Sequence, residues 1–478
     1  MTPAITEVPP GGFEAEAHYY PRVPNAQLHP LVKSFLHLGN DRIAKRYCHL
    51  HPEANADAVH RVLQTAPRYF RWAGADLFHV TNDRGIRRNV VVETNSCPSG
   101  QKSMPLRADQ EEHGGYRVLL ERSFLPALKA RRGTPSGCLA VLSDKNPMET
   151  MGYAHALADL TGETVLHVTL PHEGWRDVVK WDDRVLYVKR DDGWQPVRAA
   201  FRYVTQKPWT RIPPLSRTYI YNPVIVCLAG GRNKLLAAKA YDLMNAELKE
   251  DGLAIRTPET IWDVSMREVP LWVERMGGVA VVKNPYSNAG QGVYTITNQA
   301  ELDAFLAVDH DYDRFIVQGL VGNLQWTSRT RGDRLYHVGT VPDKAGRIYV
   351  ADFRFMVGSN DDGFFPVALY ARRARLPLAD TLTEDADSWG MLGTNLSVKT
   401  ETGFATEPNR LMLFDQRDFN RLGLGIDDLT EGYLQTCLSV LAVDNMAQRL
   451  RSSKGRFKHR LFRTLNPDPA LSDEVLTV

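Results

Sequence analysis

Residues 89–101 read NVVVETNSCPSGQ, and the interpretation of the fold depends on this stretch. The three valines indicate a short buried strand, which a Pro/Ser/Gly turn ends at once. Because side chains alternate along a strand, Glu93 and Asn95 lie on the same face. Two oxygen ligands of this kind suit Mg²⁺, which takes one or two carboxylates and completes its shell with phosphate and water. A solvated strand end explains the same residues, so the rest of the chain has to decide.

The composition is that of an ordinary globular protein. The 478 residues suffice for two or three domains, and 43% are hydrophobic and 24% charged. A net charge of +2 gives no overall attraction to nucleic acid or membrane, and no apolar run is long enough to span a bilayer. The N-terminus lacks the features of a secretory signal, and five scattered cysteines favour reduced thiols over a zinc site. We therefore expect a cytoplasmic protein that binds neither nucleic acid nor membrane; a homodimer is left open.

The sequence pattern divides the chain into regions. Residues 1–25 are rich in Pro and Gly and are expected to be extended, and apolar spacing predicts helices over 26–66. Residues 111–230 alternate helix and strand, as in PMETMGYAHALADLTG and ETVLHVTL, which predicts a parallel α/β layer. Several strands follow from residue 231. The last segment, residues 451–478, is strongly basic and is expected to be a solvated helix end or tail.

The stretch GGVAVVKNPYSNAGQGVYTI, residues 277–296, predicts two strands joined by a glycine-bearing turn. The first strand ends at Lys283, and the turn contains Asn288, Gly290 and Gly292. Glycines let backbone N–H groups approach phosphate, and the lysine supplies a positive charge for the same oxygens. A plain hairpin with a polar tip is an equal alternative for this stretch alone.

Three further stretches carry weaker signals. RFIVQGLVGN predicts a buried strand that ends at Gln318 and Leu320, a junction able to present backbone groups to an adenine edge, although an ordinary core strand explains it as well. YVADFRFMVG and PVALYARRAR place Arg354 and Arg372 on neighbouring strands, as an anion clamp or as a solvated sheet face. SWGMLGTNLS places Asn395 after a glycine-bearing turn.

The order of these motifs over residues 231–450 resembles the ATP-grasp superfamily. VVKNPYSNAGQGV is similar to its small glycine-rich loop, FIVQGLV to its adenine hinge, and DFRFMV, ALYARRAR and GTNLS to its arginine and asparagine strands. GGRNKLLAAKAYDLMN resembles the segment that opens this core, which makes Lys234 a second phosphate-facing lysine. The single motifs are loose, and the resemblance depends on their order.

One family element stands in an unusual place. ATP-grasp cores close with an Asp-bearing strand and a Glu-x-Asn strand, which hold magnesium, and the region after Asn395 has no Glu-x-Asn strand. Residues 71–100 supply the pattern instead, with Asp76 on the first strand and Glu93 and Asn95 on the second. This order resembles the circularly permuted ATP-grasp ligases, the group of eukaryotic-type glutathione synthetase and glutathionylspermidine synthetase.

The resemblance implies a fold of the α/β (α+β) class, a circularly permuted ATP-grasp fold with an adjoining parallel α/β pre-grasp domain. It also implies divisions of the chain: an extended segment at 1–25, N-terminal helices with the permuted metal-binding hairpin at 26–110, an α/β substrate domain at 111–230, an ATP-grasp core at 231–450 with a glycine-rich lid at about 255–318, and a basic tail at 451–478.

The function implied is that of an ATP-dependent carboxylate-amine ligase that forms an amide bond through an acyl phosphate. ATP and two Mg²⁺ ions are the implied cofactors, with Mn²⁺ as a substitute, and the partners are small-molecule or peptide carboxylates and amines. The implied site residues are Arg354 and Arg372 for catalysis; Lys234, Lys283, Asn288, Gly290, Gly292, Gln318 and Leu320 for the nucleotide; Asp76, Glu93 and Asn95 for the metal; and Arg71, Ser96 and Ser99 for the carboxylate substrate. For Arg71 a structural ion pair is an equal alternative.

The sequence departs from the glutathione synthetases in the glycine-rich loop. An acidic metal ligand of those enzymes is missing, and Ser287 and Asn288 stand near its place. Glutathione is therefore not the expected product, and peptides, amino acids or a polyamine fit as substrates. Two other functions remain open: an ATP-grasp kinase that phosphorylates a small molecule, and a non-catalytic nucleotide-binding protein.

Overall fold

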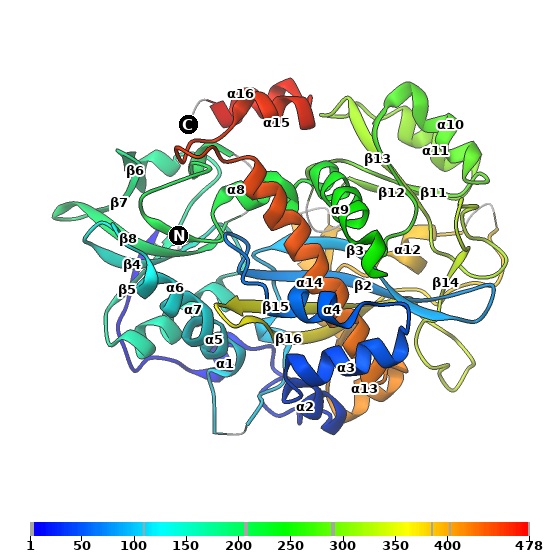
Figure 1. Cartoon of the computed structure of the whole chain (residues 1–478), viewed down its shortest axis with the longest axis horizontal. Helices are drawn as coiled ribbons and strands as arrows, with labels where there is room; N and C mark the ends of the chain where they lie inside the picture. Colours follow the sequence, from blue (N-terminus) through cyan, green and yellow to red (C-terminus); the bar gives the residue numbers. More distant parts are fainter. Residues whose placement is uncertain are drawn as a thin grey trace.

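The computed structural model describes residues 4–108, 110–204, 209–287, 292–383, 386–400 and 403–476. In Figure 1 a mixed α/β layer lies on the left, a central antiparallel sheet in the middle and a smaller antiparallel sheet on the right. None of the helices in these residues is both long and apolar enough to cross a membrane.

The central sheet unites two distant parts of the chain. Its strands are β2 (Trp72–Asn82), β3 (Arg87–Ser96), β14 (Leu335–His337), β15 (Ala351–Asn360), β16 (Gly363–Arg373) and β19 (Leu411–Leu413). Strand β2 pairs with β3 on one side and with β15 on the other, so that Asp76 lies opposite both Glu93 and Arg354. The expected pairing of the 71–100 hairpin with later strands is thus confirmed.

Helix α14 (Ile426–Arg449) packs across this sheet with α2 (Pro30–Leu36), α3 (Asn40–Leu50), α4 (Ala56–Gln64) and α9 (Lys234–Leu248). The predicted helices over 26–66 are therefore present. Helix and sheet approach closely at Gly432, where a Cβ atom would lie 3.0 Å from the ring of Phe353 and 3.1 Å from Leu77. Glycine at this position lets the buried helix lie directly on the strands.

The α/β layer consists of β1 (Ile5–Val8), β4 (Cys138–Ser143), β5 (Val165–Thr169), β6 (Val179–Asp182), β7 (Val185–Arg190), β8 (Gly193–Tyr203) and β9 (Tyr219–Tyr221). Strands β5, β4, β8 and β9 are parallel, as predicted, but β1, β6 and β7 add antiparallel edges. Asp183 and Arg184 join β6 to β7 with positive φ at both residues, as in a two-residue hairpin turn. The sheet is therefore mixed, and the N-terminal segment supplies one of its edge strands.

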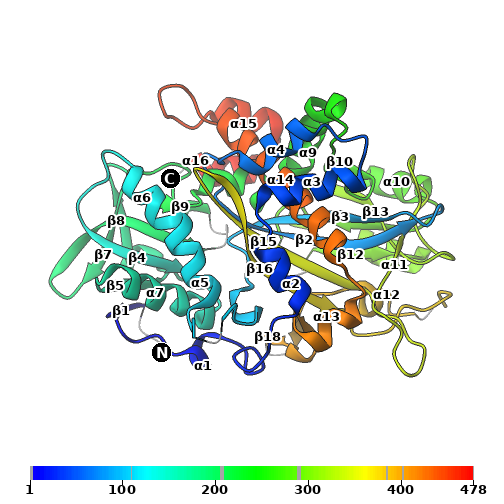
Figure 2. The ribbon, with the colours of Figure 1, turned by 60° about the horizontal axis from the view of Figure 1, so that its bottom comes forward.

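Helices pack against the α/β layer (Figure 2), where Phe124 and Tyr153 both contact Phe201 of β8. These helices include α5 (Gly114–Leu119), α6 (Leu125–Ala130) and α7 (Pro147–Thr161). Helix α7 ends at Gly162, whose φ of +69° and N–H bond to the Ala158 carbonyl form a left-handed C-terminal cap. The remaining helices and strands are α1 (Ala15–His18), α8 (Val224–Val226), α12 (Ser388–Leu392), α13 (Gln416–Leu422), β17 (Ser397–Thr400) and β18 (Gly403–Thr406).

The smaller antiparallel sheet, here called the lid sheet, has its own core. Its strands are β10 (Thr260–Ser265), β11 (Ala280–Lys283), β12 (Val293–Ile296) and β13 (Arg314–Gly319), flanked by α10 (Val269–Arg275) and α11 (Gln299–Leu306). The buried side chains of Val264, Val273, Val282, Phe305 and Phe315 belong to a cluster separate from the main core. The lid sheet is therefore packed as a unit of its own.

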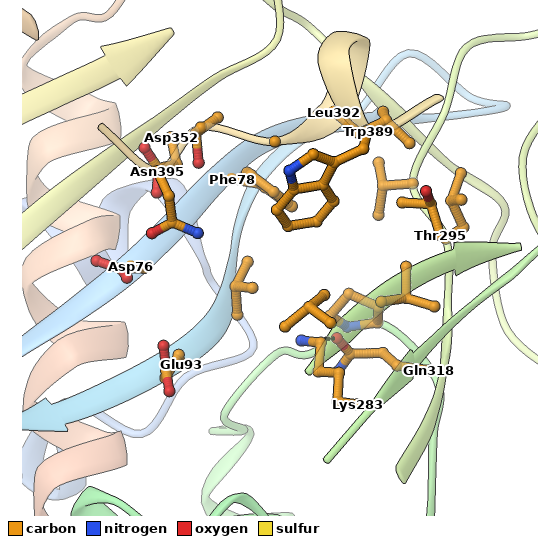
Figure 3. Close-up of a pocket in the computed structure, with 18 of the residues that line it drawn as sticks. Asp76, Phe78, Glu93, Lys283, Thr295, Gln318, Asp352, Trp389, Leu392 and Asn395 are labelled. Atoms are coloured by element: carbon orange, nitrogen blue, oxygen red, sulfur yellow. Dashed lines mark hydrogen bonds between the residues drawn. The ribbon is translucent and has the colours of Figure 1, made fainter. Parts of the chain in front are cut away.

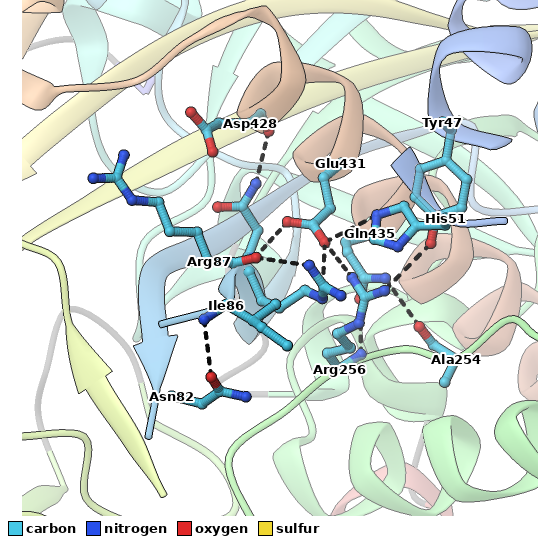
Figure 4. A network of polar contacts seen from close by, with 12 residues as sticks. Tyr47, His51, Asn82, Ile86, Arg87, Ala254, Arg256, Asp428, Glu431 and Gln435 are labelled. Carbon is cyan, nitrogen blue, oxygen red and sulfur yellow. Dashed lines mark hydrogen bonds and ion pairs between the residues drawn. The ribbon is translucent and has the colours of Figure 1, made fainter. Parts of the chain in front are cut away.

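A polar network fastens the segment that leads into the lid sheet (Figure 4). Glu431 on α14 accepts hydrogen bonds from Arg256 Nη1 at 2.5 Å and from the Asn89 N–H at 2.8 Å. Burial raises the pKa of Glu431, but its partners His51 and Arg256 outweigh burial and hold it below the usual value. Since Val91 N–H also donates to the Arg256 carbonyl, residue 256 is tied to both α14 and β3.

The C-terminal segment, expected to be a solvated helix end or tail, is helical and buries several apolar side chains. It forms α15 (His459–Leu465) and α16 (Pro469–Leu476), which bury Phe462, Leu471 and Val475. Lys239 Nζ also donates to the Leu465 carbonyl at 2.6 Å. The segment looked solvated in the sequence because its basic residues outnumber the apolar residues that stand between them.

The buried His167 predicts a loss of stability in acid. Its Nε2 lies 2.9 Å from Thr150 Oγ1 and 3.2 Å from Ser143 Oγ, and burial lowers its pKa from 6.5 to about 4. Between these values the unfolded chain binds the proton and the folded chain does not, so stability falls as pH drops from 6.5 to 4. Thermal melts across this range should show a steeper fall for the wild type than for His167→Gln, while the exposed His49→Gln should follow the wild type.

Candidate active site

A cleft opens between the central sheet and the lid sheet, and we call it the inter-sheet cleft. It holds about 910 Å³ of empty space, part of which is open to solvent. Figure 3 shows carboxylates of the central sheet on one wall and Lys283 and Gln318 of the lid sheet on the other. The site residues that the cleft contains are Asp76, Glu93, Lys234, Lys283, Gln318, Leu320 and Arg372.

One end of the cleft is apolar. Phe78, Val281, Leu320 and Leu392 line it, and the ring of Trp389 stands in its middle (Figure 3). Trp389 is 39% exposed, so its ring can stack on a planar ligand in the cleft. The sequence did not predict Trp389, because an aromatic residue in a short turn gives no sign of its exposure.

Leu320 lies in this apolar end, but its backbone is already bonded within the chain. Its N–H donates to Ser328 Oγ at 2.7 Å, and its carbonyl accepts from Ser328 N at 3.0 Å and from Thr327 Oγ1 at 2.9 Å. The expected backbone contact to an adenine edge is therefore not available at Leu320 in this structure. Its side chain remains as an apolar contact.

Lys283 ends β11 and points into the cleft. Its Nζ donates to Gln318 Oε1 at 2.7 Å, and Gln318 Nε2 donates to Thr260 Oγ1 at 2.8 Å. Burial lowers the pKa of Lys283 to about 8, against the opposing influence of Glu93. The lysine is therefore positively charged at neutral pH, and the side chain of Gln318 holds it in place.

Lys234 joins three parts of the site. It is the first residue of α9, after the helix cap Asn233, and its Nζ donates to the carbonyl of Ser287 at 2.9 Å and to its Oγ at 3.0 Å. The same Nζ lies 3.2 Å from Glu93 Oε1. Burial raises the pKa of Glu93, but the positive charges of Lys234, Arg232 and Lys283 together outweigh burial and hold it below its usual value. The predicted lysine, the start of the glycine-rich loop and the strand carboxylate thus meet at one point.

Two arginines and two aspartates form a buried cluster on the central sheet. Arg354 binds Asp76 through two hydrogen bonds, Nε to Oδ1 at 2.6 Å and Nη2 to Oδ2 at 2.7 Å. Arg372 lies 3.1 Å from Asp76 and binds Asp352 with Nε at 3.0 Å. Although burial raises it, the two guanidinium groups lower the pKa of Asp76 to about 2. The predicted clamp therefore holds carboxylates of the protein itself.

Asp352 is a residue that the sequence analysis missed. It lines the cleft and pairs directly with Arg372 across the β15–β16 hairpin. The sequence could have predicted it, because Asp352 precedes Arg354 by two residues on the same strand and so lies on the same face.

The turn after β3 reaches the same cluster at Ser99. The Ser99 carbonyl accepts from Arg354 Nη1 at 3.1 Å and from Tyr370 Oη at 2.9 Å. Its hydroxyl donates to Glu149 at 2.8 Å, and the Gly100 N–H donates to Glu149 at 2.9 Å. A buried carboxylate at the start of α7 therefore holds the turn beside Arg354.

None of the three residues predicted for the carboxylate substrate lines the cleft, although Ser99 contacts Arg354. Ser96 is buried, with its Oγ 3.1 Å from Cys227 Sγ. Arg71 lines a different pocket, where its Nη2 lies 3.4 Å from Asp361 Oδ1. Ser96 is adjacent to Asn95 and so points to the opposite face of the strand, and Arg71 stands at the far end of β2.

The donor set fits Mg²⁺ as part of a shell. Asp76 and Glu93 are cross-strand partners, and Asn95 Nδ2 lies 3.5 Å from Asp76 Oδ2. Asn95 Oδ1 accepts from Arg232 Nη1 at 3.0 Å. In the described part of the chain, no three or more His, Cys, Asp and Glu side chains form a group that could hold a metal ion. Two carboxylates and an amide are nevertheless the oxygen ligands that Mg²⁺ uses together with phosphate.

The glycine-rich loop is described only in part. Asn288 and Gly290 lie outside the described residues. Gly292 has φ of +63° and accepts from the Asn284 N–H at 2.7 Å. A Cβ atom there would lie 2.5 Å from Asn284 Nδ2, so glycine is needed where the predicted loop returns to β12.

Two antiparallel sheets line the cleft, with Lys283 on one wall and the carboxylates on the other, which is the arrangement that the resemblance to the ATP-grasp superfamily implied. No family model and no curated protein matches the chain. The chain is similar to several solved structures at low sequence identity.

A glutathione synthetase-like effector from Globodera pallida is 10% identical, with a TM-score of 0.38, covering 73% of this chain and 86% of that chain. An ATP-grasp RimK domain protein from Sphaerobacter thermophilus is 14% identical, with a TM-score of 0.28, and the match covers 48% of this chain and 90% of that chain. D-alanyl-alanine synthetase A from Vibrio cholerae is 11% identical, with a TM-score of 0.29, and the match covers 55% of this chain and 94% of that chain. TM-scores this low carry no argument about the site, which depends on the geometry above.

Proposed function

We propose that the protein is an ATP-dependent carboxylate-amine ligase with a circularly permuted ATP-grasp core. One observation carries this proposal: Lys234 contacts both Glu93 and Ser287, which brings a metal-type carboxylate to the start of the glycine-rich loop. These residues come from segments almost 200 residues apart in the sequence, and a solvated strand end would not need such a contact. The hairpin of β2 and β3 takes the place of the closing strands that the later segment lacks.

The cleft suits ATP in one orientation. The base lies in the apolar end against Trp389, and the phosphates extend toward Lys283 and Lys234. Asp76, Glu93 and Asn95 would hold Mg²⁺, which when bound neutralises phosphate charge. The two lysines offset the repulsion between the γ-phosphate and an incoming carboxylate.

The reaction then has two steps. An oxygen of the substrate carboxylate attacks the γ-phosphorus, and the bond to the β,γ-bridging oxygen breaks. ADP departs, and the substrate is now an acyl phosphate. The nitrogen of an amine attacks the carbonyl carbon of the acyl phosphate, phosphate departs and the nitrogen loses a proton. Arg354 and Arg372 keep Asp76 ionised at the wall of the cleft. Arg372 also binds Asp352, and Arg354 fixes the turn at Ser99.

Release of ADP tests the proposal directly. The full-length protein is incubated with Mg²⁺ and ATP and with pools of carboxylates and amines, and we expect ADP release that requires one member of each class. Hydroxylamine should trap the acyl phosphate as a hydroxamate in the absence of amine. Phosphorylation of a hydroxyl without hydroxamate would indicate a kinase, and absence of nucleotide binding would overturn the whole assignment.

Trp389→Ala should weaken ATP binding. Loss of one stacking ring is expected to reduce affinity by about tenfold, since base–aromatic stacking contributes roughly 1–3 kcal/mol. Calorimetric titration with a non-hydrolysable ATP analogue measures this loss. Trp194→Ala, which removes another partly exposed tryptophan on β8, is the control and should bind as the wild type does. Equal affinity in both variants would remove Trp389 from the nucleotide site.

A further inference from the structure

A second cavity lies on the side of the molecule where β2 begins. It holds about 850 Å³ of empty space, part of it open to solvent. Five arginines line it, and we call it the arginine pocket: Arg68, Arg71, Arg131, Arg184 and Arg451. They come from four segments, namely the entry to β2, the end of α6, the turn between β6 and β7, and the turn that follows α14.

The charge of this pocket is not balanced by its lining. Among the described residues no Asp or Glu lines it, whereas in the inter-sheet cleft Lys234 and Arg372 have carboxylate partners. Arg71 lies 3.4 Å from Asp361, whose side chain is 82% exposed. Water screens an ion pair with such an exposed partner, so Asp361 offsets little of the positive charge of the pocket. The whole chain carries a net charge of only +2, so the five charges are a local concentration.

Aromatic rings and backbone groups hold several of the guanidinium groups in place. Arg451 Nη1 donates to Tyr69 Oη at 2.7 Å, and its Nε is buried without a hydrogen-bond partner in the described structure. Arg131 Nη2 donates to the Ser216 carbonyl at 3.3 Å, and its guanidinium carbon lies 5.3 Å from the centre of the Tyr219 ring. These contacts fix the positions of two of the guanidinium groups that line the pocket.

The backbone beneath the pocket is also fixed. Asn222 Oδ1 accepts from the N–H groups of Arg71 at 3.0 Å and of Trp72 at 3.2 Å. Burial lowers the pKa of Arg131, and the nearby charge of Arg451 lowers it further. The positive charges are thus held close together by the fold, which raises their attraction for an anion.

We propose that the arginine pocket binds a small organic anion with at least two phosphate groups. Guanidinium groups bind phosphate oxygens in pairs, and five of them around one cavity exceed what a single phosphate can use. The hydroxyls of Ser216 and Thr218 in the lining add neutral donors. The five arginines surround a single cavity of about 850 Å³, which suits a small molecule, whereas a nucleic acid strand would need a groove that follows its backbone. This site is separate from the inter-sheet cleft and independent of the proposed ligase activity.

Binding of inorganic tripolyphosphate to the full-length protein tests the proposal. The Lys283→Met variant is used as background, because it weakens binding in the inter-sheet cleft. Calorimetry should detect one equivalent of tripolyphosphate in this background, with affinity that falls as salt rises. The double variant Arg131→Gln/Arg451→Gln should lose affinity at least tenfold.

A matched double variant controls for net charge. Arg267→Gln/Arg417→Gln removes two exposed arginines elsewhere and should bind as the background does. Equal loss in both doubles would mean non-specific attraction and would overturn the proposal. If the first double fails to fold in thermal melts, the exposed Arg68→Gln replaces it and is expected to lose affinity severalfold.

Two further probes exclude other ligands. Vesicles that carry phosphatidylinositol bisphosphate and a short single-stranded DNA are tested against the same variants. Binding of either one without binding of tripolyphosphate would assign the pocket to a membrane headgroup or a nucleic acid and overturn the proposal. Binding of tripolyphosphate that Lys283→Met abolishes would place the anion in the inter-sheet cleft instead.

Discussion

Replacing Glu93 with glutamine is expected to reduce ATP-dependent turnover by about two orders of magnitude or more, as removal of one preorganised electrostatic group does in other active sites. The substitution keeps the size of the side chain but removes the charge that faces Lys234 at 3.2 Å. Asp76 and Asn95 remain, so the metal site is weakened and not dismantled. The fold should persist, because Glu93 is only partly buried and contributes little to the core.

The measurement is steady-state ADP release across a Mg²⁺ titration, with thermal melts of each variant. Excess Mg²⁺ should restore part of the turnover of Glu93→Gln, because the variant binds the ion more weakly but keeps the other groups of the site in place. Glu173→Gln makes the same chemical change at an exposed loop position and should keep full turnover. Wild-type turnover and Mg²⁺ dependence in Glu93→Gln would make Glu93 a solvated strand-end residue and remove the main support for the ligase.

The sequence predicted the strands of the site well because alternation and motif order are local signals. The valines before Glu93 formed β3, Lys283 ended its strand as expected, and the distant hairpin of β2 and β3 joined β15 in one sheet. That long-range pairing was predicted from a missing element of a family pattern. Periodicity by itself says nothing about which strands become neighbours.

The residues that the sequence misplaced depend on contacts between segments. Whether Trp389 is buried or exposed is decided by α12 lying at the edge of the lid sheet, where Ser388 Oγ is 2.6 Å from Thr295 Oγ1. Arg71 immediately precedes the strand of Asp76, but it lines a different pocket together with four other arginines. Strand position predicts the face of a side chain, but not the loops that surround it.

Arg354→Gln is expected to lower the free energy of unfolding by about 3–5 kcal/mol, the cost of leaving one member of a buried ion pair without its partner. Arg354 and Asp76 are both buried and share two hydrogen bonds of 2.6 and 2.7 Å. Arg372 still lies 3.1 Å from Asp76 in the variant, so the loss should fall at the lower end of this range. The bond from Arg354 Nη1 to the Ser99 carbonyl is lost as well.

The structure offers a closely matched control. Arg198 also binds a carboxylate through two contacts, at 2.6 and 2.7 Å to Glu163, and donates a further bond to the Gly137 carbonyl at 2.6 Å. Its partner Glu163 is 48% exposed, so Arg198→Gln should cost no more than about 1 kcal/mol. Urea unfolding at neutral pH compares the two variants under equal conditions.

A second substitution separates burial of charge from loss of packing. In Asp76→Asn/Arg354→Gln no unpaired carboxylate remains, so stability should recover by a large part of the loss seen in Arg354→Gln. Turnover should not recover, because the double variant lacks the charge of Asp76 that the metal site needs. If Arg354→Gln lost no more stability than Arg198→Gln, the buried cluster would not be an electrostatic support of the fold. If the double variant regained turnover, the cluster would not be a wall of the active site.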